Sequence, residues 1–407
     1  IYYFIPSSII YYYKREKGEC ILVKLLLLAD IHIGAIKDPS YVYNVLQEII
    51  DREIGMEPCD AVIILGDYFD HLFKANEANT ALAINVMSYL VRKCKQQGTK
   101  IRIVYGTEGH EMGQYKLFNY HLTSFGTDMK VIQTVTEEEL LPGVPVLYLP
   151  EEYVSSKGEF YHDALYSGKT YRYIFGHGTI VEGVPEAMTY GSTQPKVKHV
   201  PQFSVRDFAD THASVFFGHY HQHVVINPEC CYVGSLFRYK FGEETPKGYV
   251  VLRDDGWEFV ENTRAYDYRT ITVDETSDVY ESAEKLVAAL NKVQRENEDI
   301  LSGTTLGKLR LVFHVPKEAF PEYKETIRTL MTNQRSMTYL IKDTGFLEET
   351  EPETEEDEKT KEVLSYLLEP KLDISTKINW FLKEYVQPEQ VLDKETIQRY
   401  ITEPLEL

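Results

Sequence analysis

The residues of this chain that could do chemistry are aspartates and histidines grouped in short blocks. Five blocks follow apolar runs and read, in order, DIH, GDYFD, GTEGHE, GHG and GHYH. The candidate site residues in them are Asp30, His32, Asp67, His110, His177, His219 and His221. One such block is a weak signal, because a single loop histidine is more often a hydrogen-bonded structural residue. Five blocks, each at the end of an apolar run, predict a single polar site.

The mixture of carboxylates and imidazoles indicates a site for two divalent cations. Two cations about 3.5–4 Å apart share one carboxylate, and mixed Asp and His ligands suit Mn, Fe or Zn better than Mg or Ca. Asp67 leaves an apolar run and is the candidate for the shared ligand. His219 and His221 are two positions apart, so on an extended segment they face the same way. Glycines directly before Asp67, His177 and His219 would let the backbone turn and aim these side chains at the site.

Alternating apolar runs and helical stretches must position these blocks, and they predict an α/β domain. Helices are expected over residues 42–54 and 81–94. Strands are expected over residues 23–30, 61–67, 101–106, 171–178 and 214–223. The ligand blocks then lie at the carboxyl ends of strands, where an open α/β sheet binds its ligands.

The bulk composition limits what the chain can bind unaided. With 407 residues, 43% hydrophobic and 26% charged, it is globular and long enough for one large domain with appendages. The formal net charge of −20 argues against a broad basic face, so cations, local basic loops or a partner must attract any DNA. The candidate basic contacts, alternatively plain solvated charges, are Lys196, Lys198, His199, Arg238 and Lys240. The five cysteines lack CxxC spacing, which predicts reduced thiols in the cytoplasm.

Changes of composition divide the chain into segments. Residues 23–265 carry the ligand blocks, and residues 266–345 have the strand-helix-strand-helix-strand pattern of a small α+β domain. Residues 346–362 form an acidic run, which is typical of a solvated linker. Residues 363–407 contain two amphipathic helical patterns and are expected to be a partner-binding tail.

The first segment, residues 1–22, is expected to be conceptual translation of an untranslated leader. The chain begins with Ile1 rather than Met, and Val23 opens a strand that resembles the start of a complete domain. The alternative is an N-terminal extension lying on the surface. Its apolar run is shorter than the about 20 residues that a membrane helix needs, so no membrane span is expected.

The five blocks together resemble those of the calcineurin-like metallophosphoesterase superfamily. The segment GSLFRYKFGEETPKGYVVL resembles the strand-turn-strand that follows the last histidine pair of SbcD-type nucleases, and the resemblance covers about residues 23–253. It implies a metallophosphoesterase fold: a β-sandwich core flanked by helices, with a small α+β capping domain and a C-terminal helical tail. It implies two metal ions, for which Mn²⁺ is preferred, and it puts His110 beside the scissile phosphate, stabilising the transition state or protonating the departing oxygen. The implied ligands are Asp30, His32, Asp67 and His221 for the first metal, and Asp67, His177 and His219 for the second.

The GTEGHE block departs from the pattern of the superfamily. An asparagine that binds the second metal usually stands directly before the histidine, and here Gly109 takes that place. Either Glu108 substitutes as an oxygen ligand or water fills the position. Asp70 and His71 could orient the bridging aspartate or could be solvent-facing turn residues. We expect no ligand role for His223.

The resemblance implies a metal-dependent DNA nuclease, an exonuclease that can also have endonuclease activity. This nuclease would be the subunit of an SbcCD-type repair and recombination complex, paired with an SbcC-type coiled-coil ABC ATPase and forming a homodimer. One alternative is a stand-alone metallophosphatase or cyclic-nucleotide phosphodiesterase, which would leave the appended segments unexplained. The other is a non-enzymatic scaffold with a decayed site, against which the five intact blocks argue.

Overall fold

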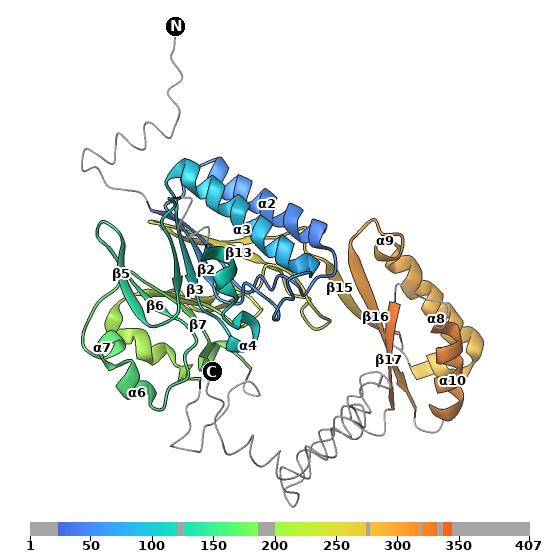
Figure 1. Ribbon diagram of the computed structural model, residues 1–407. Helices are drawn as coiled ribbons and strands as arrows, with labels where there is room; N and C mark the ends of the chain where they lie inside the picture. Colours follow the sequence, from blue (N-terminus) through green and yellow to red (C-terminus); the bar gives the residue numbers. More distant parts are fainter. Residues whose placement is uncertain are drawn as a thin grey trace, which may run out of the picture. The chain divides into compact units, whose positions relative to one another are not determined.

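The computed structural model describes residues 23–119, 126–185, 200–273, 277–316, 320–331 and 337–343 (Figure 1). The segments expected at 1–22, 346–362 and 363–407 lie outside these residues. The chain divides into two compact units, Ile1–Thr270 with Asn297–Leu309 and Ile271–Glu296 with Arg310–Leu407. In the described residues no helix combines the length and the apolar character that crossing a membrane requires.

Two six-stranded sheets form the body of the first unit. The first has the order β14-β13-β1-β2-β3-β4 and the second the order β11-β12-β10-β7-β6-β5. The strands of the first sheet are β1 (Lys24–Leu28), β2 (Ala61–Leu65), β3 (Lys100–Val104), β4 (Met129–Ile132), β13 (Gly248–Arg253) and β14 (Gly256–Glu261). Those of the second are β5 (Thr136–Leu141), β6 (Val144–Leu149), β7 (Tyr173–His177), β10 (Ser214–Gly218), β11 (Val224–Asn227) and β12 (Cys230–Tyr232).

The directions of the strands bring together the carboxyl ends that precede the candidate site residues. Strands β1 to β4 run parallel to one another, as do β6, β7, β10 and β12, while β13, β14, β5 and β11 run antiparallel to their neighbours. The carboxyl ends of β1, β2 and β3 therefore meet along one edge, and those of β6, β7 and β10 along another. The chain is mixed α/β, as the sequence predicts.

The core follows from the alternation of side chains along each strand. On β1, Leu25 and Leu27 face the second sheet, in a cluster that includes Val146 of β6 and Phe175 of β7. Residues between them, such as Leu26, face the opposite side and pack with the helices. The two sheets thus pack face to face through one fully buried apolar layer, and a third cluster covers the outer face of the second sheet.

Two long helices, α2 (Pro39–Gly55) and α3 (Ala78–Gln97), cover the outer face of the first sheet (Figure 1). Asp38 caps α2 by accepting hydrogen bonds from the backbone N–H groups of Ser40 and Tyr41. Helix α3 ends at Gly98, whose φ of 72° is left-handed. The shorter elements of this unit are α4 (Glu108–Glu111), η1 (Gln114–Phe118), α6 (Lys157–Phe160), α7 (His162–Leu165), β8 (Thr179–Ile180), η2 (Val181–Gly183), β9 (Gln202–Phe203) and η4 (Val205–Thr211).

The remaining elements follow the order expected for residues 266–345. A three-stranded sheet has the order β15-β16-β17, and α8 buries Leu286, Leu290 and Val293. The unit boundary falls at Thr270, and residues 297–309 group with the first unit, so the second unit is not one continuous segment. The elements are β15 (Asp267–Thr272), η5 (Ser277–Glu281), α8 (Ala283–Glu296), α9 (Glu298–Leu301), β16 (Gly307–Val315), α10 (Phe320–Met331) and β17 (Met337–Asp343).

Candidate metal centre

The structure brings all seven predicted site residues together at the carboxyl ends of the strands. They form three overlapping groups, and in each group one candidate ligand atom per residue lies within 4.8 Å of the others. The groups are Asp30, His32 and His221; His32, Asp67 and His110; and Asp67, His177 and His219. The third group contains the ligands that the resemblance implies for the second metal. Asp67 and His32 each belong to two groups, so the three form one continuous cluster.

Neighbouring strands explain this convergence. Asp30 and His32 follow β1, Asp67 follows β2, and these strands pair in parallel register, with Leu28 opposite Ile64. His177 ends β7, and His219 follows β10, which pairs in parallel with β7. The two sheets of the sandwich therefore contribute ligands from both sides of one edge.

Backbone strain is concentrated at these residues. Asp30, His32, Asp67 and His219 all have positive φ angles, of 48°, 42°, 48° and 95°. Such left-handed conformations are uncommon outside glycine and cluster at functional sites. Only two other non-glycine residues in the described chain, Met112 and His212, have positive φ.

The glycines beside the ligands serve mainly to leave space, which corrects the sequence-based expectation that all of them turn the backbone. Gly66, before Asp67, has a φ of 77°, and a Cβ there would lie 2.2 Å from His177 Nδ1. Gly218, before His219, needs no left-handed backbone, but a Cβ would lie 2.1 Å from the carbonyl oxygen of Leu65. Gly176 likewise leaves room for the Phe217 ring. Close packing of the two sheet edges therefore demands glycine.

Hydrogen bonds orient three of the histidines. His177 Nδ1 lies 2.8 Å from the Leu65 carbonyl oxygen, and His221 Nδ1 lies 2.9 Å from Glu243 Oε1. His110 Nδ1 donates to the Asp70 carbonyl oxygen. These acceptors put a proton on each Nδ1, and the contact directs each Nε2 toward the cluster, as in metal sites where a carbonyl or carboxylate holds the ligating imidazole.

Nitrogen and oxygen atoms of the cluster lie close together at its centre. His221 Nε2 lies 3.1 Å from His32 Nε2, and His177 Nε2 lies 3.4 Å from Asp67 Oδ2. The Asp30 carboxylate accepts from the His219 backbone N–H at 2.9 and 3.1 Å. Nitrogen and carboxylate donors converging at these distances fit divalent ions such as Mn²⁺ or Zn²⁺.

Burial and charge shift the ionisation of the cluster in opposite directions. Burial lowers the pKa of His32 to about 3 and that of His219 to about 4, so both imidazoles are neutral at pH 7. Burial raises the pKa of Asp30. Burial alone would lower the pKa of His177, but the carboxylates of Asp67 and Asp30 outweigh it and raise that pKa to about 10. The carboxylates of Asp30 and Asp67 therefore favour a positive charge beside them. A proton on His177 supplies that charge here, and a divalent cation would supply it when bound.

The third block adopts a geometry that the sequence left open. Glu108 is exposed, its carboxylate accepts a hydrogen bond from Tyr105 Oη at 2.9 Å, and it belongs to none of the three groups. A Cβ at Gly109 would meet nothing within 4 Å. Thr107 instead lies at the site: its backbone N–H donates to Asp67 Oδ1 at 2.7 Å.

The other candidates have local structural partners. Asp70 contacts His32 and His110, with its Oδ1 3.7 Å from His32 Nδ1, and in the described residues no hydrogen bond or ion pair joins it to Asp67, the predicted bridging ligand. His71 lies between Asp70 and Glu77 at 3.0 Å from each. His223 Nδ1 lies 2.9 Å from the Tyr232 carbonyl oxygen, outside the cluster, as expected.

The basic residues predicted as candidate DNA contacts have different surroundings. Arg238 donates to the carbonyl oxygens of Thr245, Glu244 and Tyr266, so its guanidinium holds a turn, and Lys240 is exposed. Lys196, Lys198 and His199 lie outside the described residues.

Several residues around the cluster escaped the sequence analysis. Tyr239 Oη donates to the Asp30 and Ile31 carbonyl oxygens at 2.7 and 2.8 Å. Buried Lys247 donates to the His221 carbonyl oxygen at 2.7 Å and lies 3.7 Å from Glu243. The segment that follows GHYH thus supports the backbone of the candidate site residues. From the sequence, only the identities of the side chains in this turn could have indicated that role.

Glu111 is a further residue that the sequence analysis did not single out. It is fully buried, and burial raises the pKa of its carboxyl to about 8. Its Oε1 accepts from the Tyr68 backbone N–H at 3.3 Å and from Tyr115 Oη at 2.8 Å. Glu111 therefore ties the loop after Asp67 to the short helix that carries His110.

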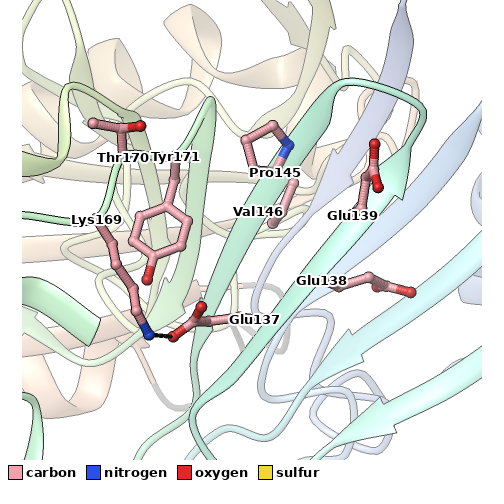
Figure 2. A pocket seen from close by; sticks show the side chains of 8 residues that line it. All are labelled: Glu137, Glu138, Glu139, Pro145, Val146, Lys169, Thr170 and Tyr171. Atoms are coloured by element: carbon pink, nitrogen blue, oxygen red, sulfur yellow. Dashed lines mark hydrogen bonds and ion pairs between the residues drawn. The ribbon is translucent and has the colours of Figure 1, made fainter. Parts of the chain in front are cut away.

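A pocket of about 340 Å³ lies apart from the metal centre, along β5 and β6 (Figure 2). Lys169 pairs with Glu137 at 2.6 Å inside it. Its lining residues are Glu137, Glu138, Glu139, Pro145, Val146, Lys169, Thr170 and Tyr171. None of the seven site residues lines this pocket, so it is not where the cluster would bind a substrate.

Comparisons with known proteins add no identification. No protein-family model and no curated protein matches the chain. Solved structures do match, and one crystal structure aligns with 59% of this chain and 99% of its own, at 13% sequence identity and a TM-score of 0.35. Similarity this low carries no argument, so the functional reading rests on the geometry of the site.

Proposed function

We propose that this chain is a metal-dependent DNA nuclease of the metallophosphoesterase type, the nuclease subunit of an SbcCD-type repair and recombination complex. The observation that carries the proposal is the continuous cluster, in which Asp67 groups with His177 and His219 and also with His32, which in turn groups with Asp30 and His221. A carboxylate shared in this way is what a two-cation site for phosphodiester hydrolysis requires. The strained backbone and the oriented imidazoles support the same reading.

Each residue has a role in this proposal. Asp30, His32 and His221 would hold the first cation with Asp67, and His177 and His219 would complete the second. When bound, the two cations would activate water and neutralise the charge on the phosphate oxygens. His110 lies at the half-buried rim with its Nδ1–H bound to the Asp70 carbonyl, which leaves Nε2 facing the cluster; a proton carried on Nε2 in the imidazolium form would pass to the departing oxygen and leave the neutral Nδ1–H ring.

The charge of the chain bears on its substrate and partners. A protein with a net charge of −20 attracts DNA poorly by itself. The cations supply local attraction, and an SbcC-type ATPase would supply the rest of the DNA-binding surface. A homodimer working in the cytoplasm completes the proposal.

Hydrolysis assays with Mn²⁺ test it. Wild-type protein should degrade linear duplex or single-stranded DNA in preference to p-nitrophenyl phosphate. Asp67→Asn should reduce DNA hydrolysis by at least about a thousandfold without unfolding the chain, because it removes the charge that holds two cations together. The control is Asp51→Asn, which removes from α2 a carboxylate that pairs with Lys93 of α3. Activity on p-nitrophenyl phosphate alone would favour a phosphatase, and near-normal nuclease activity of Asp67→Asn would refute the two-cation assignment.

A further inference from the structure

The donor set for the second cation is one protein ligand short. The first cation would have Asp30, His32 and His221 in addition to Asp67, whereas the second would have only His177 and His219 in addition. The block that should provide the missing oxygen has glycine at the critical position, and Glu108 is turned toward Tyr105. An oxygen donor from another element would complete the set.

Glu151 comes from such an element. It follows β6, which lies beside β7 in the second sheet, and its backbone N–H donates to the Tyr105 carbonyl oxygen at 3.1 Å. That bond joins the carboxyl end of β6 to the carboxyl end of β3. The Glu151 side chain is therefore delivered to the same edge as the histidines of the cluster.

The Glu151 carboxylate faces the second-cation group. Its Oε2 lies 3.7 Å from His219 Nδ1 and 3.3 Å from Thr107 Oγ1. Thr107 Oγ1 in turn lies 3.4 Å from His177 Nε2. Glu151 itself belongs to none of the three groups, but it contacts one imidazole of the second-cation group directly and the other through the Thr107 hydroxyl.

A carboxylate in this position needs a positive partner. The Glu151 side chain is only 4% exposed, and burying an ionised carboxylate is costly unless it is paired or bound to a metal. Two divalent cations would bring four positive charges, against which Asp30 and Asp67 supply two negative ones. A third carboxylate improves this balance.

We propose that Glu151 is an oxygen ligand of the second cation, taking the role that the GTEGHE block does not fill. This inference rests on the proposed two-cation site and adds a ligand to it. A glutamate makes the second site more anionic than a neutral amide ligand would.

Cation binding measured on the full-length chain separates this role from a structural one. Mn²⁺ stoichiometry and affinity are measured by calorimetry and by metal analysis after dialysis, for wild type, His177→Ala, Glu151→Gln and Glu152→Gln. Wild type and Glu152→Gln should bind two Mn²⁺ ions. Glu151→Gln should keep the first and bind the second at least about 10- to 100-fold more weakly, approaching His177→Ala.

The choice of variants makes the result specific. Glu152 is the matched control, because it is the neighbouring glutamate and its Oε2 accepts from the Val135 backbone N–H at 2.9 Å. Glutamine at position 151 can still accept the Thr107 hydrogen bond, so a purely structural role would leave Mn²⁺ affinity unchanged. Should Glu151→Gln not fold, Glu151→Asp is compared with Glu152→Asp, and a weakened second site only in the former supports the role.

Two results would overturn the inference, and they are distinguishable. Wild-type affinity for both ions in Glu151→Gln removes Glu151 from the ligand set while the two-cation site stands. Failure of the wild type to bind two ions refutes the proposed function itself, and the Glu151 assignment with it.

Discussion

At the scale of single residues, backbone hydrogen bonds hold the left-handed conformations of the candidate site residues. These hydrogen bonds join the segments that follow β1 and β2. The His32 backbone N–H donates to the Asp67 carbonyl oxygen at 2.9 Å, and that of Ile33 donates to Tyr68 at 2.9 Å. Left-handed conformations of this kind cost about 1–3 kcal/mol each, so they persist only where surrounding bonds impose them. The same bonds fix where the Asp30, His32 and Asp67 side chains point.

Gly106→Ala tests how tightly this edge is packed. A Cβ at Gly106 would lie 2.3 Å from Asp67 Oδ1 and 2.4 Å from Asp67 N, so the bridging carboxylate must move. We expect loss of at least one bound Mn²⁺ and a destabilisation of about 1–3 kcal/mol. The control lies in the same block: Gly109→Ala adds a Cβ into open space and should retain both ions. Equal metal binding by the two variants would show that the edge is not tightly packed around Asp67.

The sequence predicted the histidines and aspartates that the structure brings together but did not single out Glu151, for a physical reason. Histidine blocks such as GHYH are easily recognised at the ends of predicted strands, whereas two glutamates after LYLP resemble ordinary surface charges. Only the sheet order β10-β7-β6 brings the end of β6 beside the histidine strands. Pairing between strands far apart in the sequence could not be read from one chain.

At the scale of elements, Arg102 links the two sheets through buried charge. It lies on β3 with its side chain fully buried, and its guanidinium binds both carboxylate oxygens of Glu138 on β5 at 2.7 Å. Asp128 contributes a further contact at 2.9 Å. The run IRIVYG predicted an apolar strand, and the arginine within it gave no indication of a partner 36 residues away in the other sheet.

Glu138→Gln should therefore destabilise the fold in a pH-dependent way. Burial alone would raise the pKa of Glu138, but the hydrogen bonds from Arg102 and Lys130 outweigh it and lower that pKa from 4.5 to about 2. A depressed pKa stabilises the folded state above pH 4.5, and this contribution is lost as pH falls from 4.5 toward 2. Arg102 keeps its contact with Asp128, so losing the Glu138 charge should cost about 1.5–3 kcal/mol at pH 7.

Urea unfolding at pH 7, 5 and 3 measures this effect. The gap between wild type and Glu138→Gln should be largest at pH 7 and should narrow at pH 3. Glu139→Gln is the control, because Glu139 is exposed and its carboxylate accepts only a local bond from Gly143 N–H among the described contacts, so its loss should cost little. A gap that is constant with pH would assign the effect to packing rather than to charge.

At the scale of the whole molecule, the proposed nuclease separates chemistry from partner binding. The ligands all lie in the first unit, between Asp30 and His221. The sequence predicts an acidic linker over residues 346–362, after the small α+β domain, and then two helices with apolar stripes. The first stripe consists of Ile374, Ile378, Phe381, Leu382 and Tyr385. From this composition we expect a linker that lets the tail move independently of the candidate metal centre.

Removing residues 346–407 should therefore leave hydrolysis intact and abolish assembly. We expect the shortened chain to cleave short single strands with Mn²⁺ at about the wild-type rate, because no predicted ligand is lost. It should no longer co-purify with an SbcC-type ATPase or respond to ATP, because an isolated amphipathic helix needs an apolar surface to cover its stripe. Phe381→Glu should reproduce the loss of assembly, whereas Lys383→Glu, which lies off the stripe, should not. Stoichiometric co-purification of the shortened chain would put the docking site elsewhere, and loss of all activity or precipitation would indicate that the tail packs against its own catalytic unit.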